Sequence, residues 1–461
     1  MSQYFDVLIV GAGPAGLFTA FELVESYRGL KVAIVDKGKD SRNRYCPAID
    51  GKCVNCRICH MISGGGGAGL FSDGKLVMDL DVGGHLGFLP AGEKHFLLDH
   101  IERIFSKFSV KKLNSFSPMI AKGLQDALKK HGFFLKTYRV IHIGSNDLRL
   151  IVERFTEYLR AKGVKFLFNT EVKNMQIGSN LKIATEKQKK KQTIHAKHVV
   201  FAVGKEGSKW VRQYIENVGG RFRKNNCYIG VRMEVPTEIL EPLFKTSRDP
   251  KICKRFKDGS KIKTHCFCKD GQILLLKYFG LPLVGGHTPY VNNKKFKKSN
   301  FAILLSDTRN NRYSWGDIVN YMKEVKIRAG GLLLVQRLGD FIKNKSTTPK
   351  GLENTVEPSN PYNVKPGNIS SIKLPLDFKE KFISFLESLN KCVPGIMDEN
   401  NLVYAPAVEW WMDKIQLDEK NMNLNIGNIY AIGDGAGLTQ GIVQSAATGV
   451  LVARDIRERK G

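Results

Sequence analysis

The chain has 461 residues, of which 42% are hydrophobic and 25% are charged, and its formal net charge is +28. This composition is typical of a globular protein, and the length predicts two or three domains. No apolar stretch approaches the roughly 18 residues of a membrane helix. The first residues, MSQYFDVLIVGAGPAG, show neither the basic region nor the cleavage site of a signal peptide, so we expect a cytoplasmic protein without a membrane span.

The large positive charge has two interpretations: binding to nucleic acid or to another anionic surface, or lysines spread over the solvated faces. Two basic runs stand out, EKQKKKQ at 186–192 and NKKFKK at 293–298. Each lies between strand-like segments and lacks the aromatic platform that binds single strands. We therefore expect a small-molecule substrate and no nucleic-acid partner.

The first predicted elements form one strand–helix–strand unit. The apolar run FDVLIV at 5–10 predicts a buried parallel strand, and Gly11, Gly13 and Gly16 follow it in G-x-G-x-x-G register at the start of a helix. A second buried strand ends in Asp36. Glycines at these positions let the backbone approach a pyrophosphate at the helix N-terminus, and the acid accepts hydrogen bonds from the ribose. The unit predicts a dinucleotide site.

A cysteine-rich segment follows, CPAIDGKCVNCRICH, with Cys46, Cys53, Cys56 and Cys59. The C-x-x-C-x-x-C spacing matches the first ligands of ferredoxin-type iron–sulfur runs, and sulfur ligands also suit zinc. The four thiols could equally be redox-active, or inert and packed as small apolar groups. We favour an iron–sulfur site as the working hypothesis, and zinc, redox thiols and inert thiols stay open.

The rest of the chain predicts a divided first domain and an inserted second one. Residues 1–218 form the first segment of the dinucleotide domain, interrupted at about 77–146 by a helical insertion. Short alternating runs such as YIGVRMEV predict a mostly antiparallel second domain at 219–372. Residues 373–461 then close the first domain, with a strand, a Gly-Asp-Gly turn and a helix of small residues. Helices are predicted at about 94–107, 118–131, 147–162 and 315–329.

Five motifs of this chain resemble those of a poorly characterised family of FAD-dependent (NAD/FAD-utilising) dehydrogenases of the glutathione-reductase structural class. They are GAGPAG with its acid, SGGGGAGLFSDGKL, HIGSNDL, THCFCKDG and AIGDGAGLTQGIVQSAATG. Lys269 and Asp270 replace the Pro-Gly of the family's F-C-x-C segment. The resemblance implies an α/β fold: a discontinuous, Rossmann-like FAD-binding domain with an inserted, mostly antiparallel β (α+β) substrate domain.

The resemblance also implies the cofactor. FAD would be held along its length by Gly11, Gly13, Gly16, Asp36, Lys37, Gly67, Ala68, Val172, Gly433, Asp434 and Gly441. No second glycine fingerprint follows HVVFAVGKEGS, so NAD(P)H is expected to visit the flavin only transiently.

The candidate catalytic residues are Lys75, His142, Cys266 and Cys268. Lys75 would face the flavin ring or the substrate, and His142 would donate a proton or merely cap a turn. The two cysteines would be redox thiols beside the flavin, or simply two residues of a strand. The predicted function is hydride transfer between FAD and an organic substrate, with the sulfur site as an electron relay. Two rival functions are an FAD- and RNA-binding protein of tRNA modification, and a flavin electron carrier or redox sensor.

Overall fold

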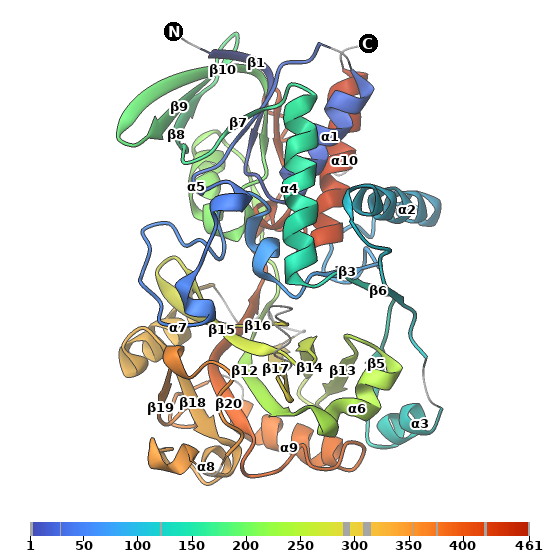
Figure 1. Ribbon diagram of the computed structural model, residues 1–461, viewed down its shortest axis with the longest axis vertical. Helices are drawn as coiled ribbons and strands as arrows, with labels where there is room; N and C mark the ends of the chain where they lie inside the picture. The colour runs from blue at the N-terminus through green and yellow to red at the C-terminus, as the bar shows by residue number, and fades with distance from the viewer. Residues whose placement is uncertain are drawn as a thin grey trace.

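Two sheets lie one above the other along the long axis of the molecule, with both chain termini at the top of the upper unit (Figure 1). The computed structural model describes residues 3–27, 29–119, 122–288, 296–307, 315–353, 355–374, 377–418 and 422–459. The basic run at 293–298 therefore lies partly outside the described residues.

The upper sheet has a parallel centre and an antiparallel flank, in the order β7-β2-β1-β10-β9-β8, with β22 also paired to β10. Its strands are β1 (Gln3–Val10), β2 (Val32–Val35), β7 (Lys165–Leu167), β8 (Glu171–Gln176), β9 (Leu181–Lys187), β10 (Lys190–Phe201) and β22 (Ile429–Ala431). The inner ends of β1 and β2 are fully buried, as expected of parallel strands covered on both faces. The two parallel strands predicted at the start of the chain are present as β1 and β2.

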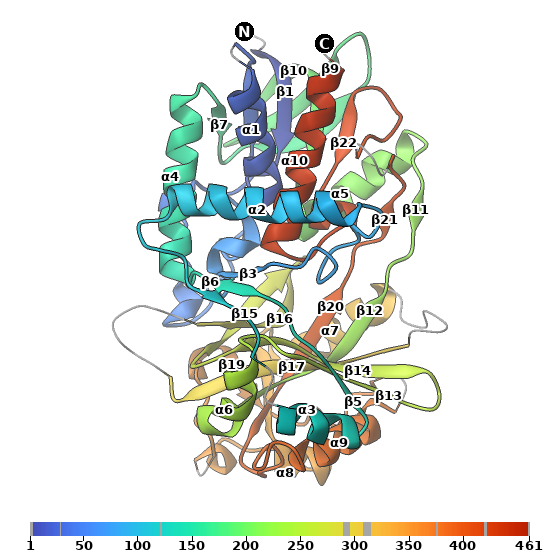
Figure 2. The same cartoon turned by 90° about the vertical axis from the view of Figure 1, so that its right-hand side faces the viewer.

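Helices α1 (Pro14–Ser26) and α10 (Ile442–Glu458) lie side by side against this sheet (Figures 1 and 2). They touch closely because Gly449 lies on the contact: a Cβ there would stand 2.3 Å from the carbonyl oxygen of Ala15. The small residues of the last helix are thus explained by close packing between two helices from opposite ends of the chain.

The lower sheet has the order β19-β18-β20-β12-β17-β14-β13-β5 and is mostly antiparallel. Its strands are β5 (Phe133–Lys136), β12 (Cys227–Pro236), β13 (Lys251–Arg255), β14 (Ser260–Cys268), β17 (Lys298–Asp307), β18 (Leu333–Arg337), β19 (Val364–Pro366) and β20 (Leu402–Trp410). Three further pairings are small: β15 (Gln272–Tyr278) with β16 (Leu281–His287), β11 (Phe222–Arg223) with β21 (Lys414–Ile415), and β3 (Lys75–Val77) with β6 (Val140–His142) and β4 (Ser115–Phe116).

Two strands of the lower sheet correct the predicted domain boundaries. β20 lies in the middle of the sheet, so the chain returns to the upper unit only after Trp410 and not at 373. β5, from the predicted helical insertion, forms the sheet's edge beside β13. The reason is burial: LVYAPAVEW is buried along nearly its whole length and needs partners on both sides.

The four helices predicted from periodicity are present as α2 (Ala91–Phe108), α3 (Lys122–Lys130), α4 (Ser145–Ala161) and α7 (Trp315–Ala329). Four others were not predicted: α5 (Gly204–Asn217), α6 (Thr237–Thr246), α8 (Leu338–Ile342) and α9 (Phe378–Asn390). α6 contains Pro242, which argues against a helix in sequence, and α8 has only five residues. None of the helices among the described residues has the length and apolar character needed to cross a bilayer.

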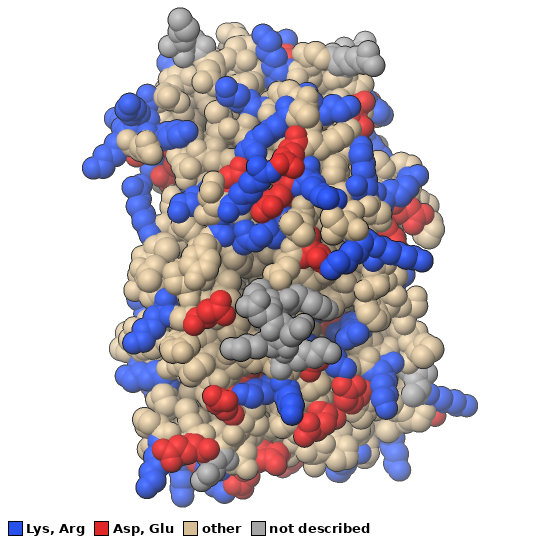
Figure 3. Space-filling view, viewed as in Figure 1, with Lys and Arg blue, Asp and Glu red and all other residues tan. Residues whose placement is uncertain are grey.

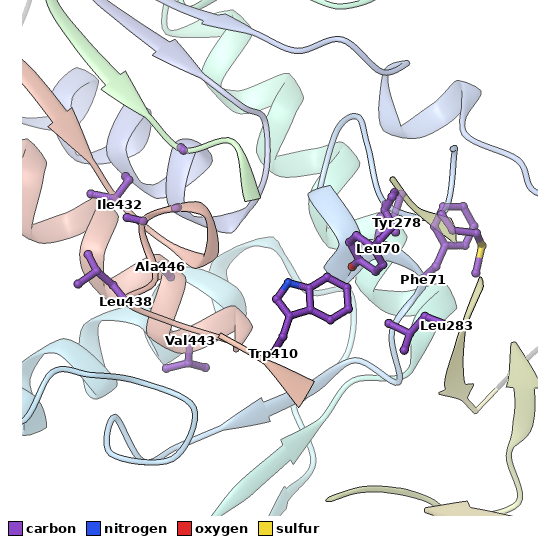
Figure 4. Close-up of a cluster of buried hydrophobic side chains, with 14 of the residues drawn as sticks. Leu70, Phe71, Tyr278, Leu283, Trp410, Ile432, Leu438, Val443 and Ala446 are labelled. Atoms are coloured by element: carbon purple, nitrogen blue, oxygen red, sulfur yellow. The ribbon is translucent and has the colours of Figure 1, made fainter. Parts of the chain in front are cut away.

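The two units meet around a cluster of buried hydrophobic side chains (Figure 4). Trp410, at the end of β20, lies at the centre, and its indole packs edge to face on Tyr278 with ring centroids 5.2 Å apart. Leu70 comes to the same cluster from the glycine-rich segment, and Val443 from the first turn of α10. Sheet, loop and helix N-terminus are therefore held together by one core.

Candidate active site

A single large cavity runs along the junction of the two units, with a volume of about 1140 Å³. It is larger than the roughly 300–1,000 Å³ of ordinary ligand pockets. All the predicted FAD-binding residues except Gly16 line it, and so do Lys75 and Cys266. His142 and Cys268 lie behind its wall.

The glycine turn after β1 forms one end of this cavity. Gly11 has φ +118°, and a Cβ there would stand 2.2 Å from the carbonyl oxygen of Ala202, so only glycine fits. Gly16 is equally tight, because its Cβ would stand 2.0 Å from the oxygen of Gly11. At Gly13 the neighbourhood is open, and a Cβ would meet only Gly67 Cα, at 3.7 Å. The first and third glycines thus shape the turn, while the second leaves free space at the N-terminus of α1 for an anion.

Asp36, at the end of β2, faces the same end. Its carboxylate accepts hydrogen bonds from the backbone N–H of Ala12 at 2.9 Å and of Gly38 at 2.7 Å. These bonds fix the carboxylate across the glycine turn, and the remaining lone pairs are available to ribose hydroxyls. Lys37, beside it, pairs with Glu206 at 3.8 Å, and Val172 of β8 lies on the opposite wall.

The glycine run 64–67 crosses the cavity wall and is held from behind by Arg44. The buried guanidinium donates to the carbonyl oxygens of Gly65 and Gly67 at 2.7 Å and of His60 at 2.6 Å. Burial lowers the pKa of Arg44 to about 10, which leaves it charged at neutral pH. Gly67 can then pass Gly13 at van der Waals distance, with Ala68 next to it on the cavity wall. No local pattern in the sequence indicates this role of Arg44.

Asp434 lies at the other end of the dinucleotide half, close to the N-terminus of α10. Its Oδ1 accepts hydrogen bonds from Thr439 Oγ1 at 2.8 Å and from Ser445 Oγ at 3.1 Å. Burial raises the pKa of this carboxyl. Gly433 and Gly441 flank it on the cavity surface, and the free amides of the first turn of α10 face the cavity. The carboxylate of Asp434 can accept hydrogen bonds from a ribityl chain. The N-terminus of α10 can stabilise negative charge at the edge of a ring.

Beyond the dinucleotide half, the cavity is bounded by a buried ionic cluster around Asp249. This carboxylate accepts hydrogen bonds from Tyr138 Oη at 2.6 Å, Lys251 Nζ at 2.9 Å and the N–H of Phe267 at 3.0 Å. Lys75 Nζ lies 3.9 Å from Asp249 and 3.2 Å from Asp73. Burial opposes these carboxylate charges, but the surrounding lysines hold the pKa of Asp249 and of Asp73 well below the usual range.

His142 stands behind Asp73, with its Nε2 3.3 Å from Asp73 Oδ1. His142 is therefore placed to support the carboxylate of Asp73, and its role as a proton donor stays a prediction. The second charged group of this end is Glu409, which lies 2.6 Å from Lys263 Nζ and 3.2 Å from His265 Nδ1. Burial lowers the pKa of His265 to about 4, so its ring is neutral at neutral pH.

Several lysines line the end of the cavity that lies against the lower sheet. Lys136, Lys251, Lys261 and Lys263 line the cavity from the strands β5, β13 and β14, against the two carboxylates Asp249 and Glu409. None of these six residues stood out in the sequence, because the pattern that unites them is a face of a sheet built from three separate segments.

The structure gives no support for the predicted metal site. Among the residues that the structure describes, no three His, Cys, Asp or Glu side chains are placed to hold a metal ion. Cys46 is buried, Cys56 is exposed, and Cys53 and Cys59 are intermediate. Asn363 fixes this segment by donating to the carbonyl oxygens of Ala48 and Gly51 and accepting from the N–H of Cys53. These contacts fix the backbone of the cysteine-rich segment from Ala48 to Cys53.

Comparisons with known proteins give distant relatives. The family model described as lycopene cyclase protein matches residues 6–51, which hold the first strand–helix–strand unit. An uncharacterized protein of Clostridium beijerinckii is 22% identical over 98% of this chain and 80% of its own length.

Three similar solved structures are a flavoprotein/dehydrogenase from Cytophaga hutchinsonii, a glycine oxidase from Geobacillus kaustophilus and a geranylgeranyl bacteriochlorophyll reductase-like protein from Thermoplasma acidophilum. Their identities are 11%, 13% and 10%, and their TM-scores 0.43, 0.42 and 0.43. The matches cover 100%, 99% and 100% of this chain, and 79%, 95% and 79% of the length of the other chain.

The chain has an α/β fold. A Rossmann-like unit carries the glycine turn and the closing helix, and a mostly antiparallel sheet covers the far end of the cavity. FAD suits this cavity because the open cradle at Gly13, the carboxylate of Asp36 and the first turn of α10 all face one continuous space.

Proposed function

We propose that this protein is an FAD-dependent oxidoreductase that transfers a hydride between the flavin and a small organic substrate. The observation that carries the proposal is the continuity of the cavity. One space of about 1140 Å³ joins the dinucleotide half to the ionic cluster around Asp249 and Lys75. A flavin electron carrier or redox sensor would not need a substrate-sized space beyond the flavin.

In this proposal the upper unit binds and orients the cofactor. Gly13 and the N-terminus of α1 would hold the pyrophosphate, Asp36 the adenosine ribose, and Val172 the adenine edge. Asp434 would accept from the ribityl chain, and the first turn of α10 would face the flavin ring. FAD supplies the hydride chemistry when bound, and the protein supplies its position and excludes side reactions.

The lower sheet would orient the substrate and hold charge beside it. Burial would lower the pKa of Lys75, but Asp249 and Asp73 outweigh that effect and raise it, so the ammonium is permanent at neutral pH. Tyr138 stays protonated because burial and the neighbouring Asp249 raise the pKa of its phenol. A fixed cation and a fixed phenol donor therefore stand near the reacting end of the cavity.

The lysines of β13 and β14 favour a substrate with an anionic group. Lys263 Nζ lies 3.7 Å from the centroid of the Tyr228 ring and is paired with Glu409, whereas Lys261 of the same face has no carboxylate within salt-bridge distance among the described residues. Like charges facing one another across strands are destabilising unless an anion joins them. We therefore place the substrate's anionic group over this face.

The rival function of an RNA-binding protein is not favoured by the face of the molecule shown in Figure 3. On the face shown in Figure 3, Lys and Arg side chains extend from top to bottom, with Asp and Glu side chains among them. A site for a polyanion would instead gather basic residues into one patch or stripe.

The proposal predicts that a small carboxylate binds next to the flavin. Adding benzoate to the anaerobic, oxidised holoprotein should shift the visible absorption of the bound flavin, and Lys261→Gln should weaken this binding about three- to tenfold because one unpaired cation is lost. The bound flavin should also be reversibly reduced by light. Lys365→Gln, on the exposed edge strand β19, is the matched control and should leave the benzoate affinity unchanged. A flavin spectrum indifferent to benzoate and to other carboxylates would contradict the anionic substrate.

A further inference from the structure

The sequence segment THCFCKDG is not used by the function proposed above, and the structure gives it an unusual shape. Cys266 and Cys268 stand near the end of β14, where the pairing with β17 is irregular: His265 pairs with Ala302, and the next pair is Cys268 with Asn300. Three steps along β14 thus oppose two along β17, which defines a bulge. In a regular strand the two cysteines would be about 6.6 Å apart on one face.

The bulge brings the two thiols together. Cys266 has φ +51°, a left-handed conformation that is rare for residues other than glycine, asparagine and aspartate. In this conformation the thiol of Cys268 donates to the carbonyl oxygen of Cys266 at 3.8 Å. Non-glycine residues in such conformations persist only where their surroundings hold them, and they concentrate at functional sites.

Three charged side chains hold this loop from different sides. Lys75 donates to the carbonyl oxygen of Phe267, the residue between the two cysteines, and Asp249 accepts from its N–H at 3.0 Å. Arg232 donates to the carbonyl oxygen of Cys266 at 2.8 Å. The ionic cluster at the substrate end of the cavity is therefore also the frame of the cysteine loop.

Arg232 points to the charge state of the pair. It is only 3% exposed, and its partners are Asn300 Oδ1 at 2.7 Å, the oxygen of Cys266 and the sulfur of Cys268 at 3.3 Å. None of the ion pairs among the described residues links it to a carboxylate. A buried guanidinium normally requires an anion nearby, and a thiolate in the adjacent cysteine pair would meet that need.

Other features agree with a thiolate on Cys266. Its hydrogen bond from Cys268, together with Lys75 and Arg232, lowers the pKa of Cys266, whereas the same hydrogen bond raises the pKa of Cys268. Space for the guanidinium is secured by Gly286, where a Cβ would stand 1.9 Å from a terminal nitrogen of Arg232. Cys266 lines the cavity, while Cys268 is fully buried behind it. The nucleophilic member of the pair therefore faces the flavin side.

We infer that Cys266 and Cys268 are a redox-active pair that exchanges two electrons with the flavin across the cavity. The inference rests on the proposed FAD site and adds a thiol–disulfide activity to it. In the oxidising direction, the thiolate of Cys266 and the thiol of Cys268 become one disulfide. Two electrons and the Cys268 proton pass to oxidised FAD, which becomes its singly protonated, two-electron-reduced form. The negative charge of the thiolate is then carried by the reduced flavin, so atoms and charge balance.

The test follows both partners in the anaerobic holoprotein. Trypsin releases both cysteines in one peptide, residues 264–269, so that alkylation before digestion reports dithiol or disulfide directly. Starting from the dithiol and oxidised flavin, each disulfide that forms should be matched by one reduced flavin. Starting from the disulfide and light-reduced flavin, thiols should reappear as the flavin is reoxidised. Cys268→Ser should abolish both exchanges, whereas Cys253→Ser, which removes another cavity-lining thiol, should leave them unchanged.

A second readout tests the thiolate without the flavin. In the dithiol protein, iodoacetamide should alkylate Cys266 faster than Cys268 at neutral pH. Arg232→Gln should slow the alkylation of Cys266 at least about tenfold, because the positive charge that helps to lower the pKa of Cys266 is lost, and Arg232→Lys should restore most of the rate. Cys253 serves as an internal reference in each variant, since burial raises the pKa of that thiol.

The two results that would overturn the inference are distinct from a failure of the FAD site. One is a pair that remains dithiol in redox buffers of every ratio. The other is a disulfide that forms without electron exchange with the flavin in either direction. If the purified chain carried no FAD, the proposed function would fail, yet the redox-buffer and alkylation measurements would still report on the cysteine pair.

Discussion

Replacing Asp249 by alanine should lower the free energy of unfolding by about 3–5 kcal/mol, the cost of removing one partner from a buried ion pair. The side chain accepts hydrogen bonds from Tyr138, Lys251 and the backbone of Phe267. Without it, the ammonium of Lys251, the phenol of Tyr138 and the N–H of Phe267 lose their acceptor, and Lys75 loses a nearby countercharge. Urea denaturation of both proteins at neutral pH measures the difference.

The pH dependence of this loss is a further check. Because the folded-state pKa of Asp249 is depressed, its contribution is present above the unfolded value of about 4 and disappears as the pH falls below it. The difference between wild type and Asp249→Ala should therefore shrink in acid. Asp99→Ala is the control: this exposed carboxylate pairs with His95 at 3.6 Å and should change stability by less than about 1 kcal/mol. Equal losses for the two variants would contradict the role of Asp249.

Gly13→Val should reduce the affinity for FAD at least about 100-fold, equivalent to about 2.8 kcal/mol, while the protein stays folded. The reason is that a Cβ at Gly13 enters open cavity space and meets only Gly67 Cα at 3.7 Å. A valine there would occupy the place expected for the pyrophosphate. Titration of the apoprotein with FAD, followed by flavin fluorescence, measures the affinity, and circular dichroism checks the fold.

Two other glycine variants separate binding from folding. Gly87→Val lies on an exposed loop with no atom within 4 Å of the added Cβ and should bind FAD like wild type. Gly16→Val should fail to fold, since its Cβ would stand 2.0 Å from the oxygen of Gly11. Normal FAD affinity in a folded Gly13→Val protein would refute the cofactor position.

The dinucleotide half could be predicted because its signals are local. A buried strand, a glycine turn, a helix and an acid follow one another within the first 36 residues. Each of these features depends on local backbone geometry, which is the same in any protein. The closing motif around Asp434 is also local, since turn and helix are adjacent in the chain. For both, sequence spacing fixes spatial position.

The substrate half could not be predicted in the same way. Tyr138, Asp249 and Lys75 come from three distant segments and meet only because β5 joins the edge of the lower sheet. Only Arg232 and Glu234 gave a weak indication of buried charge in this half, because they are two charged residues in a strand that is otherwise apolar. The metal prediction finds no support in the structure, because spacing alone does not fix where the four cysteines lie: their loop is bound by Asn363, which lies about 300 residues further along the chain.

If the cavity between the two units holds FAD, the purified protein should release this flavin when it is denatured. Chromatography of the released flavin should show FAD, and no FMN, at one molecule per chain after reconstitution, because the adenosine half of the site is formed by Asp36, Gly13 and Val172. Release of FMN, or failure of the folded apoprotein to retain FAD at any concentration, would contradict the account.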